Sequence, residues 1–156
     1  IGDFQGDEKA LGTVMDTSPH ILAHNLETVP RMHKAVRPQA KYERSMQVLS
    51  RIRNAGLVSK TGIMVGIGET DEEVLTMLKD IRERAETEII TIGQYLQPSR
   101  NHLPVDRWVH PDQFDHYKEV GLELGFRVVE SGPLVRSSFH AEEQVRSLES
   151  SRNNQN

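Results

Sequence analysis

The chain has 156 residues, of which 36% are hydrophobic and 27% are charged, and it carries a net charge of −4. This length supports one hydrophobic core, and the composition is that of a folded domain rather than of a disordered chain. The sequence contains no cysteine, which excludes disulfides, thiolate zinc sites, cysteine nucleophiles and any iron–sulfur centre held by cysteines of this chain alone. The charge offers no basic field for nucleic acid or an anionic membrane, and no apolar run predicts a membrane span or a signal peptide.

Helical and strand patterns alternate in the first half of the chain. In chain order we expect a helix over 7–16, a strand over 21–23, a short helix capped by Thr28 and running to Val36, a helix ending at Gly56, and a strand over 61–65.

The second half continues the alternation. Thr70 and Glu73 have the spacing of a capping box, so a helix is expected to begin there and to run to about Ala85. After it we expect a strand over 88–92, a long loop over 94–110, a helix from Pro111 closed by Gly125, a strand over 126–130, and a disordered tail over 144–156.

Strands that alternate with helices predict right-handed βαβ units and a parallel sheet, hence an α/β fold that is either doubly wound or a barrel. In both architectures the loops that follow the strands carry the chemistry. Here these loops contain amide and carboxylate side chains without a cluster of lysines, which favours a ligand with ribose hydroxyls, an amine and a carboxylate.

Four other interpretations are weaker. The glycines of 62–68 lack the Walker lysine and the spacing of a dinucleotide-binding turn. His24, His102 and His140 lack the spacing of metal ligands, and the serines near residue 137 lack a nucleophile elbow. A metal-free sugar or nucleotide enzyme would need a base with a perturbed pKa, which the sequence does not reveal.

Five segments together resemble lipoyl synthase, a family of radical S-adenosylmethionine enzymes. They occur in the family's order and extend over most of the chain: HNLETVPR at 24–31, VRPQAKYERS at 36–45, KTGIMVGIGETDEE at 60–73, TIGQYLQPSRNHLPV at 91–105 and SGPLVRSSFHAEEQ at 131–144. The resemblance implies the carboxyl-terminal half of a radical-SAM (β/α)6 partial barrel. Residues 1–143 would form the barrel portion with its closing segment.

The resemblance also implies the chemistry. The family binds S-adenosylmethionine at one [4Fe-4S] cluster, sacrifices a second [4Fe-4S] cluster as sulfur donor, and inserts sulfur at C6 and C8 of a protein-bound octanoyl group. The implied partners are an octanoylated lipoyl carrier domain of a 2-oxoacid dehydrogenase complex or of the glycine cleavage H protein, and an electron donor such as ferredoxin or flavodoxin. A cytoplasmic location is expected.

Residues of this sequence that match the family's motifs would contact the cofactors. The expected S-adenosylmethionine contacts are Asn25, Glu27, Arg37, Gly62, Met64, Gly66, Glu69 and Gln94. Gly62 and Gly66 would leave space for the adenosyl group, Arg37 would pair with the carboxylate, and Gln94 would face the adenine. Ser138 matches the family's unusual serine ligand to the auxiliary cluster and would be catalytic, with Ser137 as the alternative; Phe139 stands where tyrosine is commoner.

The chain departs from the family in one major respect. In the family, two cysteine motifs hold the two clusters, and both belong to an amino-terminal half that this sequence does not contain. A single serine cannot hold a cubane cluster, so we expect this polypeptide alone to carry no cluster and to be inactive. The first residue, Ile1, fits the same view of a fragment, and strand 21–23 would then form an exposed seam. The alternative is a non-catalytic module that binds S-adenosylmethionine or the carrier domain.

Overall fold

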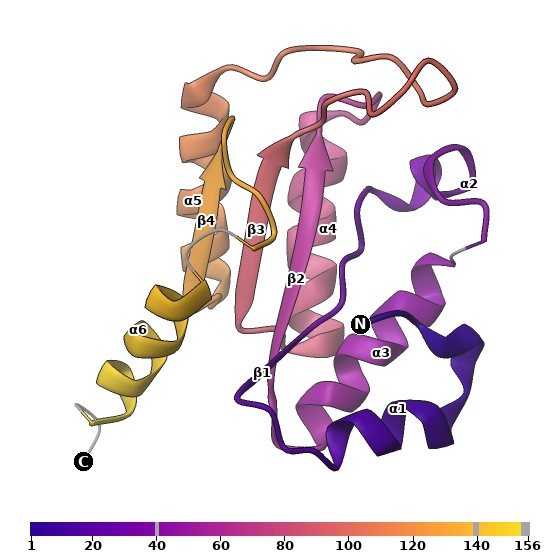
Figure 1. The fold of residues 1–156 in the computed structure, drawn as a ribbon. Coiled ribbons are helices and arrows are strands. Elements are labelled where there is room, and N and C mark those ends of the chain that lie inside the picture. The colour runs from indigo at the N-terminus through magenta and orange to yellow at the C-terminus, as the bar shows by residue number, and fades with distance from the viewer. Residues whose placement is uncertain (40, 139–140, 154–156) are drawn as a thin grey trace.

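The computed structural model describes residues 1–39, 41–138 and 141–153 (Figure 1). Four parallel strands form one sheet in the order β1 (Ile21–Ala23), β2 (Val58–Val65), β3 (Ile89–Gln94) and β4 (Val128–Gly132). The helices are η1 (Phe4–Gly6), α1 (Glu8–Met15), η2 (Pro30–Met32), α2 (His33–Val36), α3 (Tyr42–Asn54), α4 (Asp71–Ala85), α5 (Pro111–Leu124) and α6 (Ala141–Asn153). The predicted α/β class with strands alternating with helices is confirmed, and β1 lies at one edge of the sheet.

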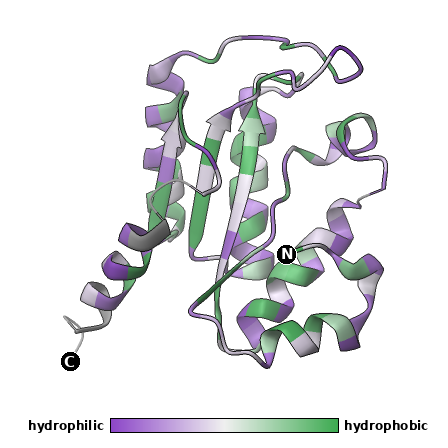
Figure 2. Ribbon diagram, in the orientation of Figure 1, coloured by the Kyte–Doolittle hydropathy of each residue, from purple (hydrophilic) through white to green (hydrophobic). Residues whose placement is uncertain are grey.

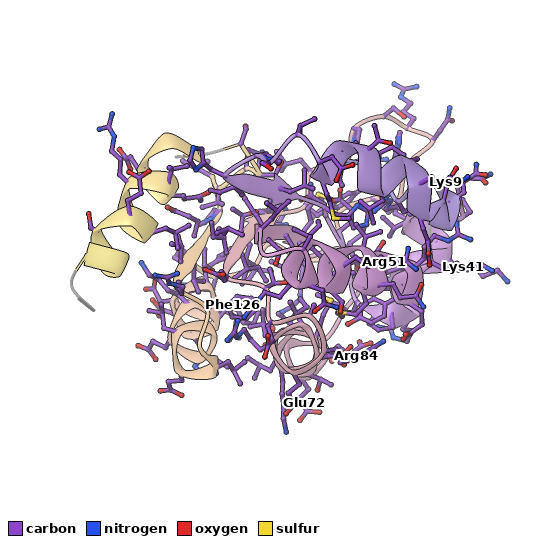
Figure 3. All side chains as sticks on the ribbon, turned by 90° about the horizontal axis from the view of Figure 1, so that it is seen from below. Lys9, Lys41, Arg51, Glu72, Arg84 and Phe126 are labelled. Carbon is purple, nitrogen blue, oxygen red and sulfur yellow. The ribbon has the colours of Figure 1, made fainter. Side chains whose placement is uncertain are left out.

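One face of the sheet packs against α3, α4 and α5 and forms the main core. Alternate residues of the strands point to this face, among them Ile63, Ile90 and Val129, and they join Leu78 and Phe114 of the helices in one buried cluster. Apolar residues run along much of the strands in Figure 2. In the end-on view of Figure 3, α4 and α5 lie on the same side of the sheet. The strands that position the site are therefore held from behind by a continuous core.

The other face of the sheet is partly covered by α6, so residues 144–153 of the predicted disordered tail are helical, while 154–156 lie outside the described residues. Leu148 of α6 is buried with Val58 and Ile89, and the Lys60 ammonium donates to Gln144 Oε1 at 2.8 Å. The polar composition of residues 144–156 suggested disorder, whereas Gln144 and Leu148 of α6 contact the sheet. Figure 3 shows α6 and α4 on opposite sides of the strands.

Most element ends follow the local signals. Thr70 and Glu73 form the reciprocal capping box at the start of α4, Pro111 opens α5, and Gly125 closes α5 with a φ of 105°. Thr28 does not cap a helix, because Val29 precedes η2 and the Thr28 hydroxyl is buried without a partner in the described residues. Strands β2, β3 and β4 are shifted or extended by a few residues relative to prediction. No helix in the described ranges is both long and apolar enough to cross a membrane.

Candidate functional site

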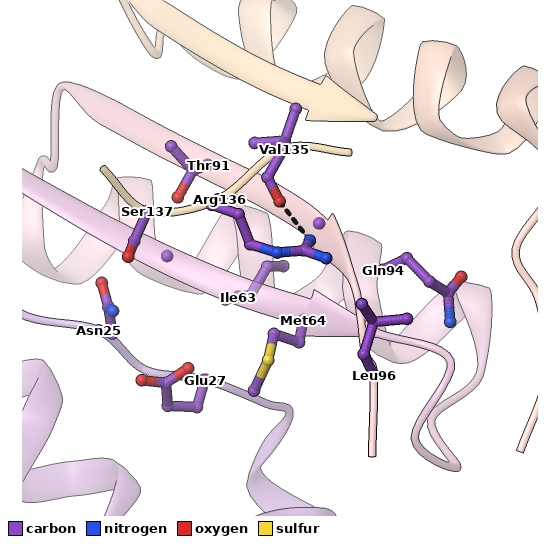
Figure 4. A pocket seen from close by; sticks show the side chains of 12 residues that line it. Asn25, Glu27, Ile63, Met64, Thr91, Gln94, Leu96, Val135, Arg136 and Ser137 are labelled. Atoms are coloured by element: carbon purple, nitrogen blue, oxygen red, sulfur yellow. Dashed lines mark hydrogen bonds between the residues drawn. The ribbon is translucent and has the colours of Figure 1, made fainter. Parts of the chain in front are cut away.

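A cavity of about 170 Å³ opens where β2 and β3 end, on the face of the sheet away from α4 and α5 (Figure 4). Its walls include Asn25 and Glu27 from the chain after β1, Met64 from β2, Thr91 from β3, and Ser137 from the chain after β4. Residues of β2 and β3 thus meet the segments that follow β1 and β4 at one place, as expected for the carboxyl ends of parallel strands. Two neighbouring hollows, of about 270 and 630 Å³, share Glu27 and Arg37 with each other.

Glu27 lies where the three hollows meet. Its backbone has a φ of 70°, in the left-handed region that is costly for a residue with a side chain. Two hydrogen bonds to β2 maintain this conformation, from Glu27 N–H to Gly62 O at 3.0 Å and from Met64 N–H to Glu27 O at 2.8 Å. The pairing continues the sheet beyond β1 and fixes the carboxylate at the cavity wall.

Two polar side chains, Asn25 and Arg37, lie beside Glu27. Asn25 lines the cavity beside Glu27, and Arg37 donates from Nη1 to the Asn25 carbonyl oxygen at 3.0 Å. Burial raises the pKa of the Glu27 carboxyl, while Arg37 and a hydrogen bond from Asn25 act in the opposite direction. A carboxylate and a guanidinium are therefore available at adjacent points of one hollow, an arrangement that suits a ligand carrying both an ammonium and a carboxylate.

Gly62 forms part of the cavity floor. A Cβ on Gly62 would lie 2.9 Å from both Asn25 Oδ1 and Thr91 Oγ1. The missing side chain therefore lets these two polar groups approach the floor of the cavity, and the space expected for a ligand directly above Gly62 is already shared with them.

Glu69 organises the turn after β2 and does not line any of these three hollows. Its carboxylate accepts hydrogen bonds from the backbone N–H groups of Gly66 at 2.6 Å, Ile67 at 3.0 Å and Gly68 at 3.1 Å, and Arg107 lies 3.4 Å away. The side chain is only 1% exposed. The carboxylate oxygens that were expected to contact a cofactor are occupied by the chain itself.

Gly66 and Gln94 both contact the loop over 95–110, and Gln94 also lines the cavity. A Cβ on Gly66 would lie 2.4 Å from Arg107 O and from Gln94 Nε2, so the loop fills the position predicted for an adenosyl group. Gln94 donates to Tyr95 O and Arg107 O and accepts from Val109 N–H. Its amide is turned toward the loop over 95–110, away from Glu27 in Figure 4.

Ser137 lines the cavity of about 170 Å³ and the neighbouring hollow of about 270 Å³, and Ser138 lines the latter. Both serines are exposed. The structure therefore brings them to the same edge as Asn25 and Glu27, although Phe139 and His140 of the same motif lie outside the described residues.

Gly93, Arg136 and Leu96 also line the cavity but were not predicted as site residues. Gly93 belongs to a buried apolar strand, and nothing in its local sequence distinguishes a glycine that admits another segment from one that only packs. Arg136 directly precedes the two serines of the closing motif, and this neighbourhood is the sequence feature that could have indicated Arg136 as a site residue.

The residues fit the two implied cofactors unequally. The cavity has the mixed charge, apolar surface and strand-end position that S-adenosylmethionine requires. A [4Fe-4S] cluster needs several thiolates, and this sequence has none. In the described part of the chain, no three or more histidine, aspartate or glutamate residues gather into a metal-binding group either.

Comparison with known proteins identifies the relatives of this chain. The family model of the radical SAM superfamily matches residues 3–81, about half of the chain. The lipoyl synthase of Rubrobacter xylanophilus is 54% identical over 92% of this chain and 45% of its own length, and that of Chlorobaculum parvum is 55% identical over 91% and 49%. The mitochondrial lipoyl synthase of Nematostella vectensis is 51% identical over 93% of the chain and 50% of its own length.

The chain spans about half the length of the curated relatives it matches. The expected resemblance to lipoyl synthases is confirmed by these relatives, and the parallel sheet with its alternating helices is consistent with a partial β/α barrel. The chain belongs to the radical SAM superfamily.

Proposed function

We propose that this chain forms the carboxyl-terminal part of a lipoyl synthase and supplies one wall of its S-adenosylmethionine site. The observation that carries the proposal is the meeting of Asn25, Glu27, Arg37 and Ser137 around joined hollows at the strand ends. The identity of about 50% to lipoyl synthases over more than nine tenths of the chain supports the same assignment.

The charges of the site match the amino acid part of S-adenosylmethionine. Arg37 makes one side-chain hydrogen bond within the described residues, to Asn25 O, so its other N–H groups can pair with the ligand carboxylate. The Glu27 carboxylate, held half-buried on a fixed backbone, would accept from the ammonium or from ribose hydroxyls. Met64 and Leu96 add apolar surface for the uncharged part of the ligand.

When bound beside a reduced cluster, S-adenosylmethionine supplies the 5′-deoxyadenosyl radical that removes hydrogen from an unactivated carbon. The task of this chain's residues is to orient the cofactor and to exclude water from the reacting atoms. Ser138, with Ser137 as the alternative, would supply the single oxygen ligand to an auxiliary cluster whose other ligands lie outside this chain. We propose that the chain alone has no lipoyl synthase activity, because its donor set is incomplete.

The substrate would be an octanoyl group on a lipoyl carrier domain of a 2-oxoacid dehydrogenase complex or of the glycine cleavage H protein, and ferredoxin or flavodoxin would supply electrons. Bacterial relatives favour a cytoplasmic location, while the Nematostella vectensis relative carries the description mitochondrial. A non-catalytic module that binds S-adenosylmethionine is the second candidate, favoured by a cavity that forms without any cysteine.

Calorimetric titration with S-adenosylmethionine tests the proposal. We expect wild type to bind, Arg37→Met to bind at least about tenfold more weakly because it loses a carboxylate pair, and the exposed control Arg53→Met to bind as wild type. No binding by wild type, or equal binding by Arg37→Met, would overturn the assignment. Anaerobic reconstitution with iron and sulfide tests the donor set separately: about four irons per chain would contradict the proposal that it is incomplete.

A further inference from the structure

The chain that leaves β4 turns back and passes over β3 at the cavity (Figure 4). Gly93 of β3 and Gly132 of β4 are direct partners in the sheet. A Cβ on Gly93 would lie 2.3 Å from the Val135 carbonyl oxygen, whereas a Cβ on Gly132 would lie 3.5 Å from Val135 Cγ2. Two paired glycines thus differ sharply in what lies above them.

The contact at Gly93 cannot be relieved by a side-chain rotation, because the obstructing atom belongs to the backbone. Ordinary carbon contacts are about 3.5 Å or longer, so a methyl group at position 93 would displace the crossing segment by about 1 Å. Five glycines of the described residues have positive φ, and Gly93 is not among them. Glycine is therefore required at position 93 to leave room for the Val135 carbonyl, and not for an unusual backbone conformation.

The crossing segment carries the side chains that close the cavity. Val135 N–H donates to Gly132 O at 3.2 Å, and the next two residues, Arg136 and Ser137, line the cavity opposite Asn25. Arg136 Nη1 would lie 3.5 Å from the same added Cβ on Gly93. The position of the whole closing segment therefore depends on the absence of a side chain at Gly93.

We propose that Gly93 is a positioning residue whose missing side chain lets residues 133–138 cross β3 and present Arg136 and Ser137 to the cavity. This inference rests on the proposed function, since it gives the crossing segment a place in the same cofactor site. It requires that a methyl group at position 93 loosen this segment before it affects the rest of the fold.

The test compares Gly93→Ala with Gly132→Ala, which adds the same methyl group to the paired residue at an ordinary contact distance. Because the chain has no cysteine and Leu134 is 83% exposed, Leu134→Cys takes a single nitroxide label outside the cavity. The spin-label spectrum reports mobility of the crossing segment, hydrogen exchange of α4 reports the fold, and titration with S-adenosylmethionine reports the site.

We expect Gly93→Ala to increase label mobility and weaken S-adenosylmethionine binding at least about tenfold, with α4 exchange unchanged. Gly132→Ala should match wild type in all three measurements. Equal label mobility in both variants would overturn the positioning role even if wild type binds S-adenosylmethionine. If wild type does not bind it but the label responds as expected, the proposed function fails and the positioning role stands.

If Gly93→Ala does not fold, two glycines inserted after Pro133 in that variant give the segment room to move away from β3. Restored folding with a mobile label at position 134 would support the steric account. Continued unfolding would overturn it.

Discussion

Glu69→Gln tests whether a buried carboxylate holds the turn between β2 and α4. The substitution keeps the shape of the side chain but replaces one acceptor oxygen with an NH₂ group. The wild-type carboxylate accepts from three backbone N–H groups, at 2.6, 3.0 and 3.1 Å, and is 1% exposed. The remaining amide oxygen can serve at most two of these donors, so one N–H group faces another donor in a buried site.

A hydrogen bond to a charged group contributes about 1.5–3 kcal/mol, and a buried donor left without an acceptor costs about 1–3 kcal/mol. We therefore expect Glu69→Gln to lower the free energy of unfolding by about 2–4 kcal/mol, a large part of a typical domain's stability. Urea denaturation followed by circular dichroism measures this loss. Glu72→Gln is the matched control, because Glu72 is exposed and points away from the sheet in Figure 3.

A loss below about 0.5 kcal/mol, the range of ordinary surface substitutions, would refute the reasoning. It would mean that the turn holds its shape without the carboxylate. Glu69 would then be available to a ligand, as the sequence motif suggested.

Three further predictions concern the sheet and its flanking helices. Lys60→Met removes the donor to Gln144, so hydrogen exchange of α6 should become at least about tenfold faster, while the exposed control Lys79→Met leaves it unchanged. Burial lowers the pKa of His33 below its usual 6.5, so the unfolded chain takes up a proton first as the pH falls; stability conferred by the neutral ring is present above about pH 6.5 and declines below it. Urea denaturation at pH 7.5 and 5.5 should show a smaller decline for His33→Gln, and an equal decline would contradict this. Thr70→Ala breaks the capping box of α4 and should cost about 1 kcal/mol in the same assay, so an unchanged midpoint would show that the cap is dispensable.

Local signals were sufficient to predict most helices and the alternation of strands with helices. The capping box at Thr70 and Glu73 involves residues three positions apart, and Pro111 and Gly125 act through their own backbone preferences. Such features depend little on the rest of the fold. The meeting of Asn25, Glu27 and Ser137 was also predictable in outline, because parallel strands deliver their following loops to one edge.

The direction of the side chains at that edge was not predictable from local signals. Gln94 binds Val109 N–H, which is fifteen residues away along a loop without periodicity. Gly66 is covered by the same loop. The path of α6 depends on Lys60, which is 84 residues from Gln144 in sequence. These contacts form only after the sheet brings distant segments together, so they cannot be predicted from the sequence pattern around each residue.

The polar residues at the strand ends therefore divide into two groups with different consequences. Glu69 and Gln94 have their buried oxygens and nitrogens satisfied by backbone groups of this chain, and a ligand would have to break those bonds to use them. Glu27 and Arg37 line the hollows with binding capacity left over, and Asn25 holds them together. A ligand in the hollows can bond the second group without breaking these contacts, whereas the bonds of the first group stabilise the walls. The same edge thus builds its own framework with one set of side chains and offers recognition with the other, which is why substitutions in the first set should lower stability and substitutions in the second should lower affinity.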